Sequence, residues 1–211
     1  AEENFKHANN INANSIKHLL KNFKGLFIYI STDYVFDGKS GPYDNLQTVN
    51  PINKYGLSKL NGEKIARELS NNLILLRTNV LFDLRSKASF LKWVIESLKN
   101  EKKIEVVDDQ ICNPISSNDL SFIINNLITN EKRGLFHSGS SKFISRFKFA
   151  KMIAQNWGLN ENLISNISTE YLEKKIDSYV AKRPLKSGLI PNQDLPLICL
   201  KKSLENLRKT E

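Results

Sequence analysis

The sequence has few cysteines and no long apolar run. Cys112 and Cys199 lie far apart and form no CxxC motif, so neither a disulfide framework nor a zinc site is indicated. No stretch approaches the roughly 18 consecutive apolar residues of a membrane-spanning helix, and the chain does not open with a signal-peptide pattern. These absences predict a cytoplasmic protein with no membrane partner.

A clustered basic surface is also lacking, although the formal net charge is +9, from 31 Lys and Arg against 22 Asp and Glu. The lysines are spread along the chain, and a dispersed charge makes no stripe for a nucleic-acid backbone. We therefore expect no nucleic-acid partner. A generally positive field favours an anionic small substrate, although a coding bias would equally explain the abundance of lysine, asparagine and isoleucine.

The three histidines, His7, His18 and His137, form no ligand cluster, so no metal is expected. His137 ends an apolar run and is interpreted as a structural histidine. Trp93 and Trp157 fall on predicted helical faces and are interpreted as core or interface residues rather than ligand platforms.

Apolar runs alternate with amphipathic stretches along the chain. Short runs bounded by turn residues predict buried strands at 26–30, 73–76, 104–107 and 134–137. Apolar spacing predicts helices at 8–22, 53–70, 88–99, 119–129, 147–157 and 201–209, and Gly158 is a predicted C-cap. The alternation predicts an α/β fold with a mainly parallel sheet.

Residues 55–59, Tyr-Gly-Leu-Ser-Lys, form a YxxxK motif on a predicted helix. A spacing of four residues places Tyr55 and Lys59 on one face, within reach of a shared ligand. A phenol with a pKa of about 10 is a poor proton donor near neutrality, and a neighbouring ammonium lowers that pKa. Taken alone, the motif fits an exposed tyrosine and a solvated lysine equally well.

The segment STDYVFDG at 31–38 directly follows the first predicted strand. Residues just past the carboxyl end of a parallel strand line the ligand crevice. A hydroxyl group there can hydrogen-bond a carbonyl oxygen that is being reduced. An ordinary Ser/Thr/Asp turn is the alternative, but such a turn does not require the Tyr-Val-Phe that follows.

Together these segments resemble the dTDP-4-dehydrorhamnose reductase family. STDYVFDG, GPY at 41–43, Pro51 and YGLSKLNGE at 55–63 follow one another in the order and with the gaps of that family. Shorter segments extend the similarity: LRT at 76–78, VVDDQ at 106–110, Asp119-Leu120, GLFH at 134–137 and Arg183-Pro184. The resemblance covers nearly the whole chain and is strongest over 26–63.

The resemblance implies an NAD(P)H-dependent oxidoreductase that reduces the 4-keto group of a nucleotide-activated deoxysugar. The implied reaction converts dTDP-4-dehydro-L-rhamnose to dTDP-L-rhamnose for a cell-surface polysaccharide. Thr32, Tyr55 and Lys59 match the family's catalytic Ser/Thr, Tyr and Lys. By this resemblance Tyr55 protonates the ketone oxygen, Lys59 binds the nicotinamide ribose and Thr32 hydrogen-bonds the ketone oxygen.

The resemblance also implies binding residues. Ser31 joins Tyr55 and Lys59 at the cofactor, which is NADPH or NADH, and Asp33 and Tyr34 match residues of the sugar pocket. A homodimer is left open.

Two further positions carry open alternatives. Arg183 is a candidate for the diphosphate, since a guanidinium fork suits phosphate oxygens, and a surface arginine is the alternative. Asn12 matches a helix asparagine of the family, with a proton relay and helix packing as equal alternatives.

The family's fold implies a Rossmann-like doubly wound parallel sheet with a small C-terminal substrate-binding lobe. Residues 1–110 are then expected to be the C-terminal part of the dinucleotide-binding domain, with the catalytic residues. Residues 111–211 would be mainly the substrate-binding lobe, with some segments returning to the first domain. None of the nine glycines forms the family's GxxGxxG loop. We therefore expect a fragment without the first strands of the sheet, with that loop encoded before Ala1.

Two segments depart from the family pattern, at 111–115 and 145–147, which leaves the sugar and base specificity open. Two other functions also remain open. One is a non-catalytic regulatory subunit resembling the methionine adenosyltransferase beta subunits. The other is an epimerase or dehydratase of the same superfamily. The intact Thr32, Tyr55 and Lys59 favour the reductase.

Overall fold

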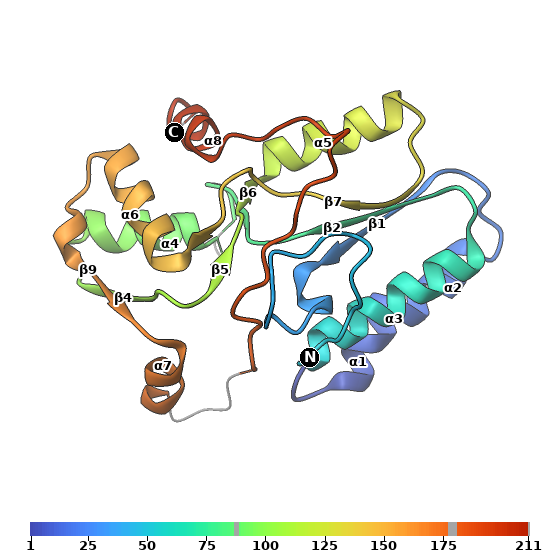
Figure 1. Ribbon diagram of the computed structural model, residues 1–211, viewed down its shortest axis with the longest axis horizontal. Helices are drawn as coiled ribbons and strands as arrows, with labels where there is room; N and C mark the ends of the chain where they lie inside the picture. The colour runs from blue at the N-terminus through green and yellow to red at the C-terminus, as the bar shows by residue number, and fades with distance from the viewer. Residues whose placement is uncertain (87–88, 177–180, 211) are drawn as a thin grey trace.

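The computed structural model describes residues 1–86, 89–176 and 181–210 and gives an α/β fold around a parallel sheet (Figure 1). The sheet has the order β1-β2-β7 and is formed by β1 (Phe27–Thr32), β2 (Leu73–Thr78) and β7 (Gly134–His137). Each of these strands overlaps an apolar run that the sequence analysis predicts as a strand, at 26–30, 73–76 and 134–137. The predicted α/β class with parallel pairing is confirmed.

Different helices cover the two faces of the sheet, because successive side chains of a strand point to opposite faces. Leu73 and Leu75 of β2 pack against α2 (Ser15–Leu20) and α3 (Lys54–Leu69). Ile74 and Leu76 pack against α5 (Ser117–Thr129). In Figure 1, α5 lies on one side of the sheet and α1, α2 and α3 lie on the other. This is the doubly wound arrangement that the sequence predicts.

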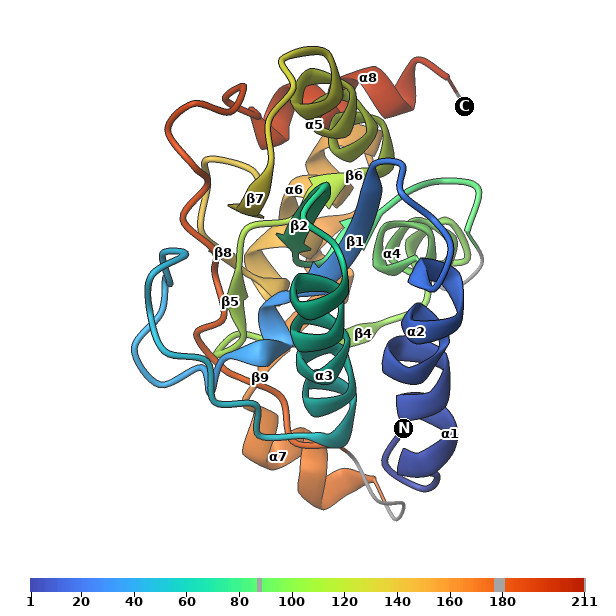
Figure 2. The same ribbon diagram turned by 90° about the vertical axis from the view of Figure 1, so that its right-hand side faces the viewer.

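The N-terminal helix contains one wide turn. α1 (Phe5–Asn9) is followed without a break by the π-helical η1 (Asn10–Asn14) and by α2. The helix begins at Phe5 because the Asn4 side chain accepts a hydrogen bond from the backbone N–H of His7 at 2.9 Å. In Figure 2 this helix runs beside α3. Single π turns inside α-helices are frequent at functional sites.

A second apolar core lies beside the sheet. It is formed by α4 (Phe90–Lys99), β4 (Ile104–Val107), α6 (Arg146–Trp157), β9 (Ile164–Ile167) and α8 (Leu200–Arg208). β4 pairs in parallel with β9, and Gly158 ends α6 at a φ of 66°, as predicted. β9 and α7 (Thr169–Lys175) are not predicted by the sequence. The helix predicted from residue 88 begins at Phe90, and residue 88 lies outside the described residues.

Two-residue strands connect the two cores. β3 (Leu81–Phe82) pairs with β6 (Ile115–Ser116), and β5 (Ile111–Cys112) pairs with β8 (Ile144–Ser145). Residues 90–107 pack in the second core, whereas 117–137 belong to the sheet, so the chain passes between the cores more than once. The predicted division at residue 110 stays a prediction. Within the described ranges, no helix is long and apolar enough to cross a membrane.

Candidate active site

The carboxyl end of β1 brings two of the predicted catalytic residues together. Thr32 is the last residue of β1, and its hydroxyl group accepts a hydrogen bond from the backbone N–H of Tyr34 at 3.2 Å. The same hydroxyl donates to Asp33 Oδ1 at 3.0 Å. Thr32 therefore caps the short helix η2 (Asp33–Val35). Tyr55 lies near this hydroxyl group, which acts to lower the pKa of the Tyr55 phenol.

The first turn of α3 lies directly against η2. Asn53 caps α3 by accepting a hydrogen bond from the Gly56 N–H at 2.7 Å. Gly56 permits the close approach, since a Cβ atom there would overlap the Tyr34 carbonyl oxygen. The rings of Tyr34 and Tyr55 meet edge to face, with centroids 5.9 Å apart. The segment that follows β1 and the predicted helix start thus place Tyr55 at the end of the sheet.

Tyr55 is a protonated phenol at neutral pH. Burial raises its pKa, and the Asp33 charge raises it further, while the nearby Thr32 hydroxyl group acts in the opposite direction. The side chains that act on this pKa are Asp33, Thr32 and Tyr34, so the predicted lowering by Lys59 stays a prediction. A substrate can still reach Tyr55, because its side chain is 41% exposed.

Lys59 lies one helical turn after Tyr55 and is half-buried. Burial lowers the pKa of Lys59 to about 8, while the charge of Glu63 acts in the opposite direction. The Lys59 Nζ atom lies 4.2 Å from the centroid of the Tyr29 ring. Lys59 is therefore mostly charged at neutral pH.

Asp33 joins the end of β1 to the C-terminal part of the chain. It is 3% exposed and accepts hydrogen bonds from Ser187 and Thr32. Burial raises the pKa of Asp33 to about 6, while those hydrogen bonds and the charge of Arg146 act in the opposite direction. A contact of Asp33 with substrate stays a prediction. Its neighbour Tyr34 lines the same small cavity as Asp33, Arg146 and Ser187.

A cleft with two arginines and two aromatic rings adjoins this site. A cavity of about 230 Å³ is lined by Arg146, Arg183, Gln110, Phe90 and Trp93, together with apolar side chains of β4 and α7 and the acidic side chains of Glu105 and Glu173. The Arg146 guanidinium lies 5.2 Å from the Phe90 ring centroid. Both arginines lower the pKa of the Tyr34 phenol, although burial raises it on balance.

A second, larger cavity shares Arg183 with the first. It has a volume of about 640 Å³ and is also lined by Lys39, Lys182 and Lys186, and by the acidic side chains of Asp109 and Glu170. The structure therefore places Arg183, predicted to bind a diphosphate, between two cavities.

Arg146 and Gln110 are site residues that the sequence analysis misses. They line both the cavity at Asp33 and the cavity at Arg183, so they join the two. A usable signal is present, because Arg146 is the first residue of α6 after the Ser145 cap. A cation is unfavourable at a helix N-terminus, and an arginine there indicates another role. Trp93 is 41% exposed and lines the cleft, so it is not a core residue, and the interface alternative stays a prediction. Trp157 is a core residue, as predicted.

A buried charge network lies behind the site. Glu63 of α3 is fully buried and accepts two hydrogen bonds from the Arg77 guanidinium of β2, at 2.8 and 2.7 Å. Ser31 donates to the same carboxylate at 2.5 Å, and Arg67 contacts it at 3.3 Å. The Ser31 hydroxyl group is thus committed to Glu63, and its assignment to the cofactor stays a prediction.

His137 extends this network as a neutral ring. Its Nε2 atom lies 3.2 Å from Arg77 Nη1, which has only protons to offer, so Nε2 accepts. Its Nδ1 atom then carries the proton and donates to the Tyr43 carbonyl oxygen at 3.2 Å. Burial and the Arg77 charge lower the pKa of His137 to about 4. The interpretation of His137 as a structural histidine is confirmed.

We expect His137 to reduce stability in acid. Its pKa is lower in the folded state than the ordinary 6.5, so its contribution is complete above pH 6.5 and is lost as the pH falls towards 4. The loss reaches about 3 kcal/mol at pH 4. The raised pKa of Asp33 has the opposite effect on stability, which increases as the pH falls from 6 to 3.8. The measurement is therefore the difference in urea-unfolding free energy between wild type and His137→Gln, and a difference independent of pH would contradict the expectation.

Asn12 lies in η1 and contacts α3. Its Nδ2 atom donates to Ser58 Oγ at 2.9 Å, and its carbonyl oxygen accepts a hydrogen bond from the Tyr29 hydroxyl group at 2.9 Å. The structure thus shows the helix-packing contacts of Asn12. A proton relay through Asn12 stays a prediction.

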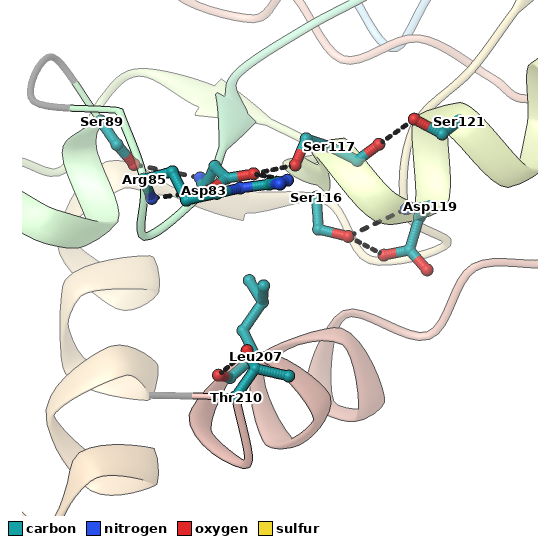
Figure 3. Close-up of polar contacts among 9 residues, drawn as sticks. All are labelled: Asp83, Arg85, Ser89, Ser116, Ser117, Asp119, Ser121, Leu207 and Thr210. Atoms are coloured by element: carbon teal, nitrogen blue, oxygen red, sulfur yellow. Dashed lines mark hydrogen bonds and ion pairs between the residues drawn. The ribbon is translucent and has the colours of Figure 1, made fainter.

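A separate polar cluster marks the start of α5 (Figure 3). The Asp83 carboxylate accepts a hydrogen bond from Ser117 and pairs with Arg85 at 3.1 Å. Hydrogen bonding with Arg85 lowers the pKa of Asp83. Ser116 caps α5 by accepting from the Asp119 N–H at 3.1 Å. These contacts anchor the loop after β3 to the helix start, so we interpret the cluster as structural.

Comparison with known proteins places the chain in a family. A model of the RmlD substrate binding domain matches residues 1–196. The dTDP-4-dehydrorhamnose reductase of Aggregatibacter actinomycetemcomitans is 31% identical over 204 residues, which cover 90% of this chain and 67% of that protein. The methionine adenosyltransferase 2 subunit beta of Danio rerio is 30% identical over 167 residues, 75% of this chain and 52% of that protein. The chain spans about half the length of several other curated relatives.

A solved structure agrees with this assignment. The dTDP-4-dehydrorhamnose reductase from Bacillus anthracis, in complex with NADP, matches with a TM-score of 0.91 and 31% identity. The match covers 100% of this chain and 76% of that chain. The resemblance found in the sequence is thereby confirmed: this chain belongs to the RmlD substrate binding domain family.

Proposed function

We propose that this chain carries the catalytic residues and the substrate cleft of an NAD(P)H-dependent reductase. The substrate class is a nucleotide-activated deoxysugar with a 4-keto group, and dTDP-4-dehydro-L-rhamnose is the first candidate. The observation that carries the proposal is the meeting of Thr32 and Tyr55 at the carboxyl end of β1, where Thr32 accepts a hydrogen bond from the Tyr34 N–H and the Tyr34 ring meets the Tyr55 ring edge to face. Lys59 follows one turn later on α3, and a cleft lined by arginines adjoins the site.

The chemistry of these side chains suits protonation of a ketone. Tyr55 is protonated at neutral pH because burial raises its pKa, so it can donate a proton to the oxygen atom of a carbonyl group that is being reduced. Thr32 is a second hydroxyl group at the same point and stabilises charge on that oxygen. The Lys59 ammonium adds a positive charge to the site. The nicotinamide cofactor, when bound, supplies the hydride for the carbonyl carbon.

The described residues fit the nicotinamide end of such a cofactor. At the carboxyl end of β2, two buried polar atoms have no hydrogen-bond partner among the described residues, Thr78 Oγ1 and Asn79 Oδ1. Thr78 is the register partner of Thr32 on the neighbouring strand. Unpaired buried polar atoms are costly unless a ligand or water pairs with them, and a carboxamide or a ribose hydroxyl group can do so. Tyr55 and Lys59 are the residues that would hold the ribose.

The cleft suits an anionic nucleotide. Arg146 and Arg183 offer guanidinium groups to phosphate oxygens. Phe90 and Trp93 offer aromatic faces, and Trp93 is exposed on one side. The combination of a positive fork with an apolar platform supports a nucleoside diphosphate rather than a free sugar.

We expect Arg183→Met to weaken binding of dTDP to the full-length protein by about 10- to 100-fold, because a hydrogen bond to a charged group contributes about 1.5–3 kcal/mol. Isothermal titration calorimetry with dTDP gives the dissociation constant. The matched control is Arg85→Met, because Arg85 is an exposed arginine in the cluster of Figure 3, away from the cleft. Equal affinities for wild type and Arg183→Met would remove Arg183 from the site.

The test of the function itself is NADPH or NADH oxidation by the full-length protein with dTDP-4-dehydro-L-rhamnose. Steady turnover with formation of dTDP-L-rhamnose supports the reductase. An epimerase or dehydratase would yield an isomerised or dehydrated product without net oxidation of the reduced cofactor, so product analysis separates these classes.

A regulatory subunit is the second candidate, since a methionine adenosyltransferase 2 subunit beta is 30% identical over 75% of this chain. That function predicts no turnover, together with a change in the kinetics of an added methionine adenosyltransferase. The reductase proposal predicts turnover of the sugar nucleotide and no change in the kinetics of the added methionine adenosyltransferase.

A further inference from the structure

Tyr29 lies in the middle of β1, on the face that carries α2 and α3, and is 7% exposed. Its hydroxyl group donates to the Asn12 carbonyl oxygen at 2.9 Å, with the Lys59 carbonyl oxygen as a second acceptor at 3.3 Å. Its ring lies under the Lys59 ammonium, with Nζ 4.2 Å from the centroid. One side chain thus contacts both the backbone and the charged end of Lys59.

The neighbouring residues are shaped around this hydroxyl group. Gly62 lies three residues after Lys59 on α3, and a Cβ atom there would overlap both the Tyr29 oxygen and the Asn12 carbonyl oxygen. The carbonyl group of Asn12 belongs to the wide turn η1. Ser58 continues the contact, because it accepts a hydrogen bond from Asn12 at 2.9 Å and donates to the Tyr55 carbonyl oxygen at 2.7 Å.

We propose that Tyr29 is a positioning residue for Lys59: its ring holds the ammonium group in place, and its hydroxyl group fixes η1 against α3. The inference rests on the proposed function, in which Lys59 serves the cofactor and the reacting ketone. The inference adds Tyr29, a residue of β1 that contacts neither the cofactor nor the ketone itself.

Two opposing effects act on the charge of Lys59. Burial disfavours the ammonium and lowers its pKa to about 8. The face of an aromatic ring attracts a cation, more strongly where water is excluded, so Tyr29 favours the charged form. Burial also raises the pKa of Tyr29 itself, which keeps its phenol neutral and able to donate. The ring therefore offsets part of the burial effect at the pH where a reductase works.

Other charged groups around α3 have partners or face elsewhere. Glu63, on the same helix, favours the ammonium but is paired with Arg77 of β2. Asp33 and Tyr34 of η2 act on the Tyr55 phenol. The titratable side chains of α1 and α2 are exposed, and these are Lys6, His7, Lys17 and His18.

The experiment measures the pKa of Lys59 directly, in the full-length protein without substrate or cofactor. The rate of acetylation of Lys59 is followed against pH by peptide mass spectrometry. We expect Tyr29→Leu to lower this pKa by about half a unit to one unit, since the cation loses the ring. Tyr29→Phe keeps the ring and should leave the pKa within about a third of a unit of wild type.

Two further variants control for a general structural effect on the Lys59 pKa. Leu75→Val alters the register partner of Tyr29 in the same apolar cluster and should leave the Lys59 pKa unchanged. Replacement of Tyr29 by trifluorophenylalanine preserves the ring's shape but weakens its negative face, and should lower the pKa as Tyr29→Leu does. The proposal would be overturned if the Lys59 pKa were unchanged in both Tyr29→Leu and the trifluorophenylalanine variant. An equal shift of that pKa in Leu75→Val would also overturn it.

This readout does not depend on the reaction. If the protein shows no reductase activity but the ring variants shift the Lys59 pKa, the proposed function fails and the role of Tyr29 at Lys59 stands. If the protein is active and the pKa does not move, the role of Tyr29 fails alone. In an active protein the alkaline limb of the kcat/KM profile should move to lower pH in Tyr29→Leu and not in Tyr29→Phe.

Discussion

Tyr55→Phe is expected to lower kcat of the full-length protein by about 10²- to 10⁴-fold, the range that a positioned general acid contributes. The ring remains and keeps its edge contact with Tyr34, so the change removes one oxygen atom and little else. Because the proton is transferred only in the transition state, KM should change far less than kcat. Initial rates of NADPH oxidation, with binding measured separately by calorimetry, check both quantities.

Tyr171→Phe is the matched control, since Tyr171 is half-exposed on α7. It should keep the wild-type rate. Undiminished turnover in Tyr55→Phe would remove Tyr55 from the chemistry. A rise in KM with an unchanged kcat would give Tyr55 a binding role instead.

Much of the fold could be predicted from the sequence because its central elements have simple patterns. β2 is buried along its whole length and appears as a continuous apolar run, LILL. α3 begins at an Asn cap and carries its apolar residues at helical spacing. The strand β9 has no such signal, because its sequence is ISNI and its two central residues are exposed. It is a strand only because β4 offers its edge.

The candidate site also contains residues that the sequence predicts and residues that it does not. Thr32, Tyr55 and Lys59 follow directly from two local motifs, and local structure suffices to place them. The local signal at Arg146, a cation at a helix N-terminus, does not show which site the residue serves, because its place depends on how α6 packs beside η2 and on the segment that carries Ser187. The raised pKa of Tyr55 could not be predicted from the motif for a related reason. The YxxxK spacing predicts a neighbouring ammonium, but the ammonium lies over Tyr29, a residue of another element.

Glu63→Gln is expected to lower the free energy of unfolding by about 3–5 kcal/mol, the usual cost of breaking one side of a buried ion pair. The Arg77 side chain is 3% exposed and would keep its charge without a carboxylate partner. Glu63 also joins three elements, since it holds Arg77 of β2 and Ser31 of β1 from its place on α3. Urea denaturation of the full-length protein gives the value from the midpoint and the slope.

Two comparisons make the result specific to the buried charge. Glu170→Gln breaks an exposed pair with Lys174 on α7 and should cost less than about 1 kcal/mol. The double variant Glu63→Gln, Arg77→Met should be less destabilised than the sum of its two single changes, because no unpaired charge remains buried. A loss below about 1 kcal/mol in Glu63→Gln would contradict the structure at this point. With the expected loss, the end of β1 that carries Thr32 depends on a carboxylate one helical turn beyond Lys59, so the stability of the fold and the geometry of the site share one residue.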